Sequence, residues 1–257
     1  MRIESVPPEL GTPLGAAPLS TRSAVWHVSG SRDDVVLKLA LPDGTGPANP
    51  VYWAREVKAY ESDVPHDVYA EHGLRPPRVL RTDHREDGSV ALWLEYVRGI
   101  AGSTWDLHRW TRFAHRLGAA QARPRPYGPT WLYRRPPPVG PLAARVQGLP
   151  LVVCHLDLRP VDLIARDADV VVLDWSHAGY GLQGEDLAGL ILANASRPEL
   201  ASAMDVELPA AYARGANITE TDVRVAIAAT APAKYGREAD EPTRRVLRTW
   251  LEGVASC

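Results

Sequence analysis

HLDLRPVD at residues 155–162 and VVVLDW at residues 170–175 decide the fold, because they place three carboxylates at the ends of two apolar runs. Transfer of a γ-phosphoryl group requires a carboxylate beside the attacking hydroxyl and oxygen ligands for the metal ions that neutralise the phosphates. Asp157, Asp162 and Asp174 can supply both. The order matches the kinase loop H-x-D-L-x-x-x-N, although the downstream acid-apolar-glycine turn reads Asp-Trp-Ser here. Either stretch alone is commonly just a buried strand with an acidic end, but the two at this spacing predict a phosphoryl-transfer site.

These residues resemble those of the aminoglycoside phosphotransferase/choline kinase-like family, whose loop usually reads H-G-D-x-x-x-x-N and whose metal-binding turn reads I-D-W or I-D-F. The wider stretch 154–188, which ends in GEDLA, is similar to an actinobacterial subgroup of phosphotransferase-like proteins. The resemblance implies an α+β, bilobal protein kinase-like fold. A small β-rich N-terminal lobe with one helix, residues 1–97, would bind the nucleotide. A hinge at about 95–99 would join it to a larger, mainly helical C-terminal lobe, residues 98–257, for catalysis and acceptor binding.

The resemblance also implies roles for the acidic residues. Asp157 would be the catalytic base that orients the acceptor hydroxyl, and Asp174 the main Mg²⁺ ligand. Asp162 stands where the family has asparagine, the second metal ligand, and its carboxylate oxygen also suits a hard cation. However, the substitution crowds three negative charges, so we expect nucleotide binding to depend more strongly on free magnesium than in an Asp162→Asn variant.

Three neighbouring residues are expected to assist. Arg159 stands where protein kinases carry a lysine that contacts the transferred phosphoryl group, and a guanidinium could do the same, although simple surface exposure is the alternative. His155 would brace the backbone of the Asp174 turn. Asp186, at the start of a predicted helix, would support the catalytic loop without taking part in the chemistry.

Lysine is scarce, with only three in the chain, so a lysine inside an apolar run is notable. Lys38 lies in VVLKLA, residues 35–40, which together with residues 25–28 predicts a β-hairpin. A helix is predicted from Asn49 to about Asp63, with Glu56 beside its apolar face. The resemblance implies that Lys38 and Glu56 form the ion pair that positions the α- and β-phosphates.

The loop at residues 15–23 is rich in small and hydroxylated residues, whose backbone N–H groups could approach phosphate oxygens. Family members often use a Ser/Thr-bearing loop here, so Ser20, Thr21 and Ser23 are candidate nucleotide contacts. The glycine spacing of protein kinases is absent, and an ordinary connector is the alternative interpretation.

A strand predicted at residues 90–97 resembles the family's hinge strand. The resemblance implies that an adenine ring would hydrogen-bond backbone groups near Glu95, Tyr96 and Val97. Without it, the segment is simply a buried strand.

The second half of the chain reads as mainly helical. Ser103 to Asp106 can cap a helix ending near Gly118, and further helices are predicted at 185–195 and 243–255. Residues 123–150 are proline-rich, so long regular elements are not expected there. The arginines of this segment could face an acidic ligand, but exposed arginines are usually just solvated.

Composition limits the partners. The net charge of -2, without a long basic stripe, argues against nucleic acid. No apolar run approaches the roughly 20 residues of a membrane span, and the first residues match no signal peptide, so a cytoplasmic protein is expected. Cys154, inside an apolar run, is expected in the core.

Three functions remain open on the sequence. The leading one is transfer of the γ-phosphate of ATP, or of GTP, with Mg²⁺, to a hydroxyl of a small natural product or antibiotic. The second is Ser/Thr phosphorylation of a precursor peptide in ribosomal peptide maturation. The third is a pseudokinase that binds or scaffolds. The chain is compact between residues 97 and 154, so a protein partner that completes the acceptor cleft is a further expectation. Aminoglycosides themselves are disfavoured, because residues 100–184 hold few acids outside the motif and many arginines.

Overall fold

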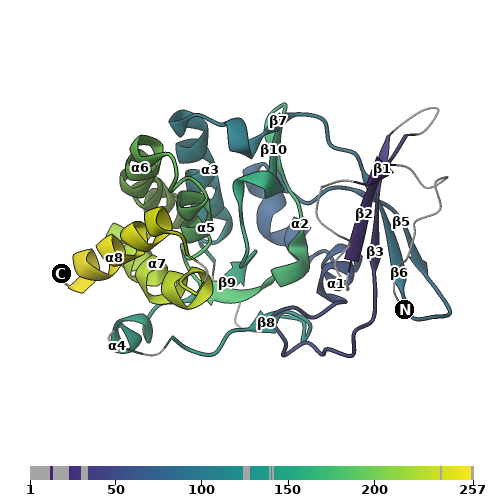
Figure 1. The fold of residues 1–257 in the computed structure, drawn as a ribbon, viewed down its shortest axis with the longest axis horizontal. Helices are drawn as coiled ribbons and strands as arrows, with labels where there is room; N and C mark the ends of the chain where they lie inside the picture. Colours follow the sequence, from purple (N-terminus) through teal and green to yellow (C-terminus); the bar gives the residue numbers. More distant parts are fainter. Residues whose placement is uncertain are drawn as a thin grey trace.

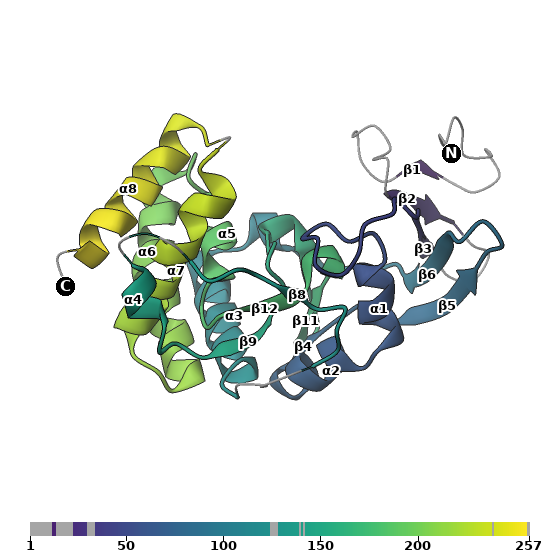
Figure 2. The same ribbon diagram turned by 90° about the horizontal axis from the view of Figure 1, so that it is seen from below.

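The computed structural model describes residues 12–13, 23–29, 34–123, 128–138, 140, 142–237 and 239–255. It separates into a β-sheet region formed by the N-terminal part of the chain and a larger, mainly helical C-terminal region (Figures 1 and 2). The helices α1 and α2, Arg55–Glu61 and Val64–Tyr69, lie between them. The expected α+β architecture is therefore confirmed, whereas the division at residue 97 stays a prediction.

The N-terminal sheet has five strands in the order β1-β2-β3-β6-β5. Their bounds are Thr12–Pro13, Ser23–Val28, Val35–Ala40, Val90–Glu95 and Val79–His84. The predicted hairpin is present, since β2 and β3 pair antiparallel with Val28 opposite Val35.

Side-chain alternation along β3 places its lysine. Leu37 and Leu39 point to one face of the sheet, where they pack with Trp26. Val36 and Ala40 point to the other face and pack with Val57 of α1. Because neighbouring residues of a strand face opposite sides, Lys38 shares the face covered by α1.

The helix predicted from Asn49 begins later than expected, at Arg55. The prediction of its start was wrong, because residues 47–50 turn around the fully buried guanidinium of Arg55 instead of continuing a helix. All five N–H groups of this side chain donate to backbone carbonyls, those of Pro47, Asn49, Pro50, Trp131 and Ser176. Burial lowers the pKa of Arg55 to about 10, and the carbonyls compensate the buried donors.

The C-terminal region combines two small sheets with a set of helices. One sheet has the order β4-β11-β10-β7, from Leu74–Arg75, Asp169–Val172, Leu163–Arg166 and Ile100–Ala101; the other has the order β8-β12-β9, from Tyr133–Arg134, Gly179–Leu182 and Leu151–Cys154. The helices are α3 Leu107–Ala120, α4 Ala143–Val146, α5 Leu187–Leu192, α6 Pro198–Ala216, α7 Glu220–Tyr235 and α8 Glu241–Ala255.

The predicted helices occur with shifted ends. Asp106 caps α3 by accepting a hydrogen bond from Arg109 N, and the helix continues two residues beyond the expected end at Gly118. Helix α5 is shorter than the predicted 185–195 segment. In the described part of the proline-rich segment, the regular elements are β8 and the single turn of α4, in line with the expectation that long elements do not form there.

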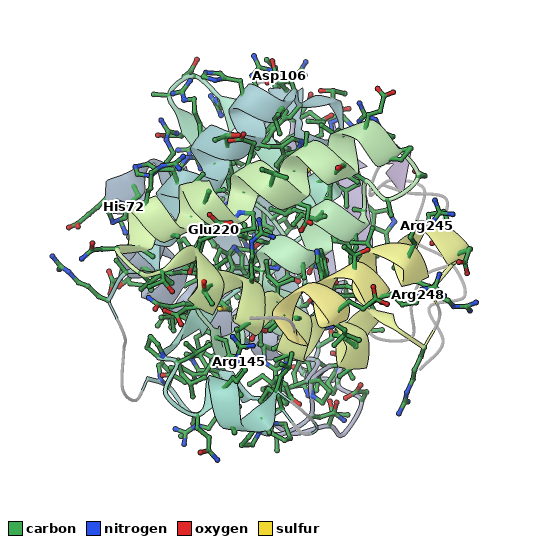
Figure 3. The ribbon with its side chains drawn as sticks, turned by 90° about the vertical axis from the view of Figure 1, so that its left-hand side faces the viewer. His72, Asp106, Arg145, Glu220, Arg245 and Arg248 are labelled. Atoms are coloured by element: carbon green, nitrogen blue, oxygen red, sulfur yellow. The ribbon has the colours of Figure 1, made fainter. Side chains whose placement is uncertain are left out.

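Helices α6, α7 and α8 close the end of the molecule that is remote from the N-terminal sheet (Figures 1 and 3). Trp250 and Val254 of α8 are buried against the main core, whereas Arg245 and Arg248 are exposed. Leu251, expected in the same apolar stripe, is 42% exposed. None of the described helices is long and apolar enough to cross a membrane.

Candidate active site

The β10–β11 hairpin brings two of the predicted carboxylates to the same end of a sheet. Leu163 pairs with Val172, so Asp162 immediately precedes one strand and Asp174 closely follows the other. Leu173 N donates to Asp162 O at 2.8 Å, which closes this end of the hairpin. Asp174 has φ +56°, a left-handed conformation that turns the chain sharply after the strand.

The catalytic loop is braced on both sides, as the sequence predicted. Asp186 accepts hydrogen bonds from His155 N at 3.0 Å and from Leu156 N at 2.8 Å. These contacts hold Leu156 at φ +63°, where a leucine is seldom found. His155 Nε2 lies 2.8 Å from Leu173 O and so ties the loop to the Asp174 turn. Asp157 is therefore presented by a fixed backbone.

Lys38 joins the two regions through two carboxylates. Its Nζ is ion-paired with Glu56 Oε2 of α1 and lies 3.1 Å from Asp174 Oδ1. Burial lowers the pKa of Lys38, but the two carboxylates outweigh burial and hold the pKa above its ordinary value. The lysine is thus a permanent cation, and the ion pair that the sequence predicted with Glu56 is present.

Asp174 keeps its charge because of the same lysine. About half of its side chain is exposed (48%). Desolvation by the surrounding protein raises the pKa of Asp174. Lys38 and a hydrogen bond from Ser176 lower this pKa by more than desolvation raises it, so the net pKa lies below the ordinary value and the carboxyl stays ionised. Tyr60 adds a neutral donor, since burial and the nearby carboxylates of Glu56 and Asp174 keep the pKa of its phenol well above the usual range.

Asp162 and Asp174 are the carboxylates that could hold a divalent metal. Burial raises the pKa of Asp162 to about 6, with a further rise from Asp174 that His155 partly opposes. Among the described residues no cluster of three or more His, Cys, Asp or Glu could hold a metal ion. Two carboxylates still fit Mg²⁺ of a nucleotide, which is usually bound by one or two carboxylates together with substrate phosphates and water.

Asp157 lies between two cations. Its Oδ2 accepts from Arg159 Nη2 at 2.8 Å, and its Oδ1 lies 3.1 Å from Lys234 Nζ. Arg159 therefore pairs with the predicted base, a contact the sequence did not suggest. Lys234, on α7, was not anticipated at all; its only sequence signal was the scarcity of lysine.

The residues expected at the hinge, Glu95, Tyr96 and Val97, differ in their surroundings. The Glu95 carboxylate is buried among Arg75, Arg78 and Arg166. The backbone N–H of Glu95 donates to Arg78 O at 3.0 Å. Burial raises the pKa of Glu95, but the arginines hold it below its ordinary value. The Glu95 side chain thus pins the junction of the two regions. The Tyr96 ring stacks on His27 with 4.4 Å between ring centroids, and Val97 is buried.

The predicted phosphate loop cannot be compared with the structure. Ser20 and Thr21 lie outside the described residues. Ser23 begins strand β2. The remaining candidates, Lys38 and Glu56, are the ones that the fold brings together with Asp174.

Two cavities flank Lys234. One, of about 540 Å³, has an apolar lining that includes Tyr133 and the three prolines 136–138, with Arg135, His177 and Lys234 among its polar residues. The other, of about 630 Å³, is lined by Asp157, Arg159, Arg237 and Asp240 around small and apolar residues. Asp157 therefore lies in the wall of the second cavity.

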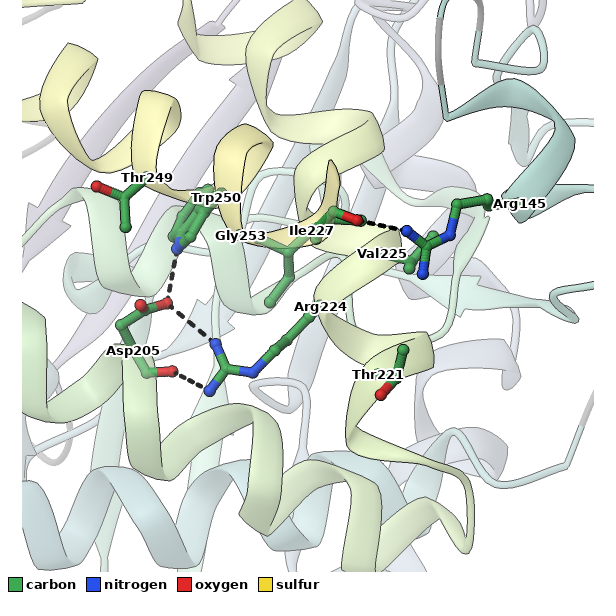
Figure 4. A pocket seen from close by; sticks show the side chains of 10 residues that line it. Arg145, Asp205, Thr221, Arg224, Val225, Ile227, Thr249, Trp250 and Gly253 are labelled. Atoms are coloured by element: carbon green, nitrogen blue, oxygen red, sulfur yellow. Dashed lines mark hydrogen bonds and ion pairs between the residues drawn. The ribbon is translucent and has the colours of Figure 1, made fainter. Parts of the chain in front are cut away.

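A further cavity, of about 280 Å³, lies among α4, α6, α7 and α8, away from these residues (Figure 4). Three of its lining side chains contact each other: Trp250 Nε1 donates to Asp205 Oδ1 at 2.6 Å, and Arg224 pairs with the same carboxylate. Arg145 donates to Val254 O. These contacts link α4, α6, α7 and α8 to one another.

Comparisons of the sequence and of the fold with known proteins point to phosphotransferases. A model of the phosphotransferase enzyme family matches residues 130–224, which include the catalytic loop and the Asp174 turn. No curated protein is significantly similar to the chain in sequence.

Several solved kinases share the fold. The amicoumacin kinase hAmiN, in complex with AMP-PNP, Ca²⁺ and Ami, has a TM-score of 0.58 at 11% identity, over 97% of this chain and 89% of that chain. Choline kinase LicA from Streptococcus pneumoniae has a TM-score of 0.54 at 14% identity, over 96% and 94%. Aminoglycoside phosphotransferase APH(3'')-Id from Streptomyces rimosus has a TM-score of 0.53 at 17% identity, over 85% and 91%. At these identities the likeness establishes the kinase-like fold.

Proposed function

We propose that this chain is an ATP-dependent O-phosphotransferase for a small hydroxylated natural product or antibiotic. The match to the model of the phosphotransferase enzyme family over residues 130–224 supports this proposal. One observation carries the proposal: Lys38, Glu56 and Asp174 meet within ion-pair distance across the two regions of the molecule. Each of these residues comes from a different part of the chain. This arrangement supports nucleotide binding, and Asp157 beside it supplies the carboxylate that transfer to a hydroxyl requires.

The nucleotide would lie between the sheet and the helical region. Lys38, held charged by Glu56, would bind the α- and β-phosphates, and the backbone of Tyr96 and Val97 would bind the adenine. Glu95 would shape this hinge through its backbone and through its arginine contacts. Asp174 and Asp162 would hold Mg²⁺, which neutralises the phosphate charge when bound. The acceptor hydroxyl would donate to Asp157, and Arg159 would stand beside the transferred group.

The acceptor is proposed to be neutral or acidic and not a polycation. The solved neighbours include kinases named for amicoumacin, choline and aminoglycosides, so the fold itself does not choose. In the cavity beside Tyr133, the charged lining residues are Arg135 and Lys234. In the cavity that Asp157 lines, the two carboxylates of Asp157 and Asp240 stand against three cations, Arg159, Lys234 and Arg237. Glu185, which lines a neighbouring cavity, is already paired with Arg135 at 2.9 Å. A dense acidic wall, which a polycationic acceptor requires, is missing from these lining residues.

The test measures transfer directly. Candidate acceptors are incubated with ATP and Mg²⁺ and followed by mass, in parallel with phosphate release from ATP in water. We expect Asp157→Asn to lower turnover by about 100-fold while ATP affinity changes little, because this carboxylate orients the nucleophile and does not bind phosphate.

Asp167→Asn is the matched control. Asp167 is exposed, and its φ of +54° is tolerated by asparagine, so this variant should behave like the wild type. Equal turnover in Asp157→Asn and wild type would refute the assignment of Asp157. Absence of ATP binding would favour the scaffold alternative.

A further inference from the structure

Two of the three lysines of the chain lie at the candidate active site. Lys38 faces the nucleotide side, and Lys234 faces Asp157 from the last turn of α7. The C-terminal end of a helix favours a cation, because the unpaired carbonyls there carry partial negative charge. Lys234 is mostly buried and its ammonium also lies over the ring of Tyr235, 4.8 Å from the centroid.

The two cations approach different oxygens of Asp157. Lys234 takes Oδ1 and Arg159 takes Oδ2. A carboxylate oxygen has two lone-pair sites, so each oxygen keeps one for another donor. The two cations therefore fix the rotation of the carboxylate without preventing an acceptor hydroxyl from donating to it.

The electrostatics agree with this geometry. Burial raises the pKa of Asp157, but Lys234, Arg159 and His177 lower it, and the net pKa lies below the ordinary value. The carboxylate therefore stays ionised and accepts a hydrogen bond strongly. Burial lowers the pKa of Lys234, and Asp157 opposes that change.

We propose that Lys234 is a positioning residue for phosphoryl transfer: its ammonium, together with Arg159, holds the Asp157 carboxylate in the orientation that receives the acceptor hydroxyl. The last turn of α7 thereby sets the geometry of the catalytic loop. This inference rests on the proposed function, in which Asp157 meets the acceptor.

The experiment compares three lysine variants through ATP hydrolysis, in which water is the acceptor. Lys234→Met removes the charge and keeps the length. Lys234→Arg keeps the charge. Lys58→Met is the matched control, because Lys58 pairs with Glu61 at 3.2 Å on the exposed side of α1, away from the site.

We expect Lys234→Met to lower kcat about tenfold or more with little change in KM for ATP, since misorientation of a reacting group acts on the chemical step. Lys234→Arg should recover most of the rate, and Lys58→Met should match the wild type. Because Lys234 lowers the pKa of Asp157, its loss should also move the acidic limb of the kcat profile to higher pH.

A second measurement does not depend on turnover. The pH titration of the Asp157 carboxyl, followed by ¹³C NMR and assigned with Asp157→Asn, should move to higher pH in Lys234→Met and stay in place in Lys58→Met. An unchanged titration, or a rate in Lys234→Met equal to that of Lys58→Met, would overturn the inference. If Asp157→Asn keeps full activity, the proposed function fails first. If Asp157→Asn loses activity but the Lys234 variants keep the rate and the titration of the wild type, the proposed function stands and only this inference fails.

Discussion

The two charged clusters of the site differ in how deeply they are buried. In the cluster proposed to bind the nucleotide, Lys38 and Glu56 have side chains only 12% and 7% exposed. On the acceptor side, Arg159 and Lys234 are 55% and 24% exposed around Asp157. Water and salt screen exposed charges but hardly screen buried ones. Loss of Lys38 is therefore expected to destabilise the folded protein more than loss of the half-exposed Arg159.

The largest effect should follow from breaking the buried cluster. Lys38→Met leaves Glu56 and Asp174 without their cation, so we expect a loss of about 3 kcal/mol in the free energy of unfolding at pH 8, together with loss of ATP turnover. Urea unfolding measures the first quantity. Burial raises the pKa of Glu56 to about 7 even with Lys38 beside it. Near pH 5 the wild-type carboxyl is therefore protonated, the ion pair contributes less, and the loss caused by Lys38→Met should shrink.

The exposed pair of Lys58 and Glu61 gives the contrast. Lys58→Met should change the unfolding free energy by less than about 0.5 kcal/mol. The double variant Lys38→Met/Glu56→Gln should regain part of the loss, because it removes the uncompensated charge. A loss in Lys38→Met no greater than that in Lys58→Met would remove the distinction between the two kinds of cluster.

A smaller effect is expected from disturbing the packing of helix α5 against the loop that carries Asp157. Gly189 of α5 lies against the catalytic loop, and an added Cβ would collide with the Leu158 carbonyl oxygen. Gly189→Ala should therefore displace the loop, lower turnover, and destabilise the protein by about 1–3 kcal/mol. Thermal unfolding and ATP hydrolysis, measured together, show both changes.

Gly253 in α8 serves as the control, since a Cβ added there would meet no described atom within 4 Å beyond its own stretch of helix. Gly253→Ala should raise stability by up to about 1 kcal/mol through helix propensity alone. If both alanine variants behaved alike, the loop would not depend on the close approach of α5.

The smallest effect concerns the metal carboxylates. In the metal-free protein, Asp162 is ionised at pH 7 although burial disfavours its charge, so Asp162→Asn should raise stability by about 1 kcal/mol. The folded pKa of about 6 lies above the unfolded value of 3.8, so this gain should decline as pH falls through 6 and vanish below about 4. Thermal unfolding across that range measures it.

The same variant tests magnesium dependence. If Asp162 adds repulsion towards ATP, binding by the wild type should need more free Mg²⁺ than binding by Asp162→Asn. Superimposable titrations of ATP binding against magnesium would dismiss this role of the carboxylate.

Sequence reasoning located the parts of the site that are encoded locally. The β2–β3 hairpin follows from a short pattern of apolar residues around a polar turn. The loop braces from His155 and Asp186 and the Lys38–Glu56 pair were expected from the family resemblance, which short motifs in a fixed order carry. Tyr60 lay within reach as well, because it stands four residues after Glu56, the spacing at which helix side chains are neighbours.

Other features depend on distant contacts that no local pattern records. Lys234 reaches Asp157 from 77 positions further along the chain, and only the packing of α7 decides that it does so. The start of α1 was predicted wrongly for a similar reason. Arg55 looks like an ordinary helix residue in the sequence, but two of its carbonyl partners, Trp131 and Ser176, come from the C-terminal region.

Those two partners bear on motion between the regions. Arg55 of helix α1 donates hydrogen bonds to backbone carbonyls of the helical region. Lys38, in contrast, belongs to strand β3 of the N-terminal sheet. If the sheet swings outwards with α1 left behind, both ion pairs of Lys38 must break, because Glu56 and Asp174 stay together on the other side. In such a motion the two ion pairs of Lys38 would hold the regions together, and a triphosphate bound to Lys38 would add to that resistance.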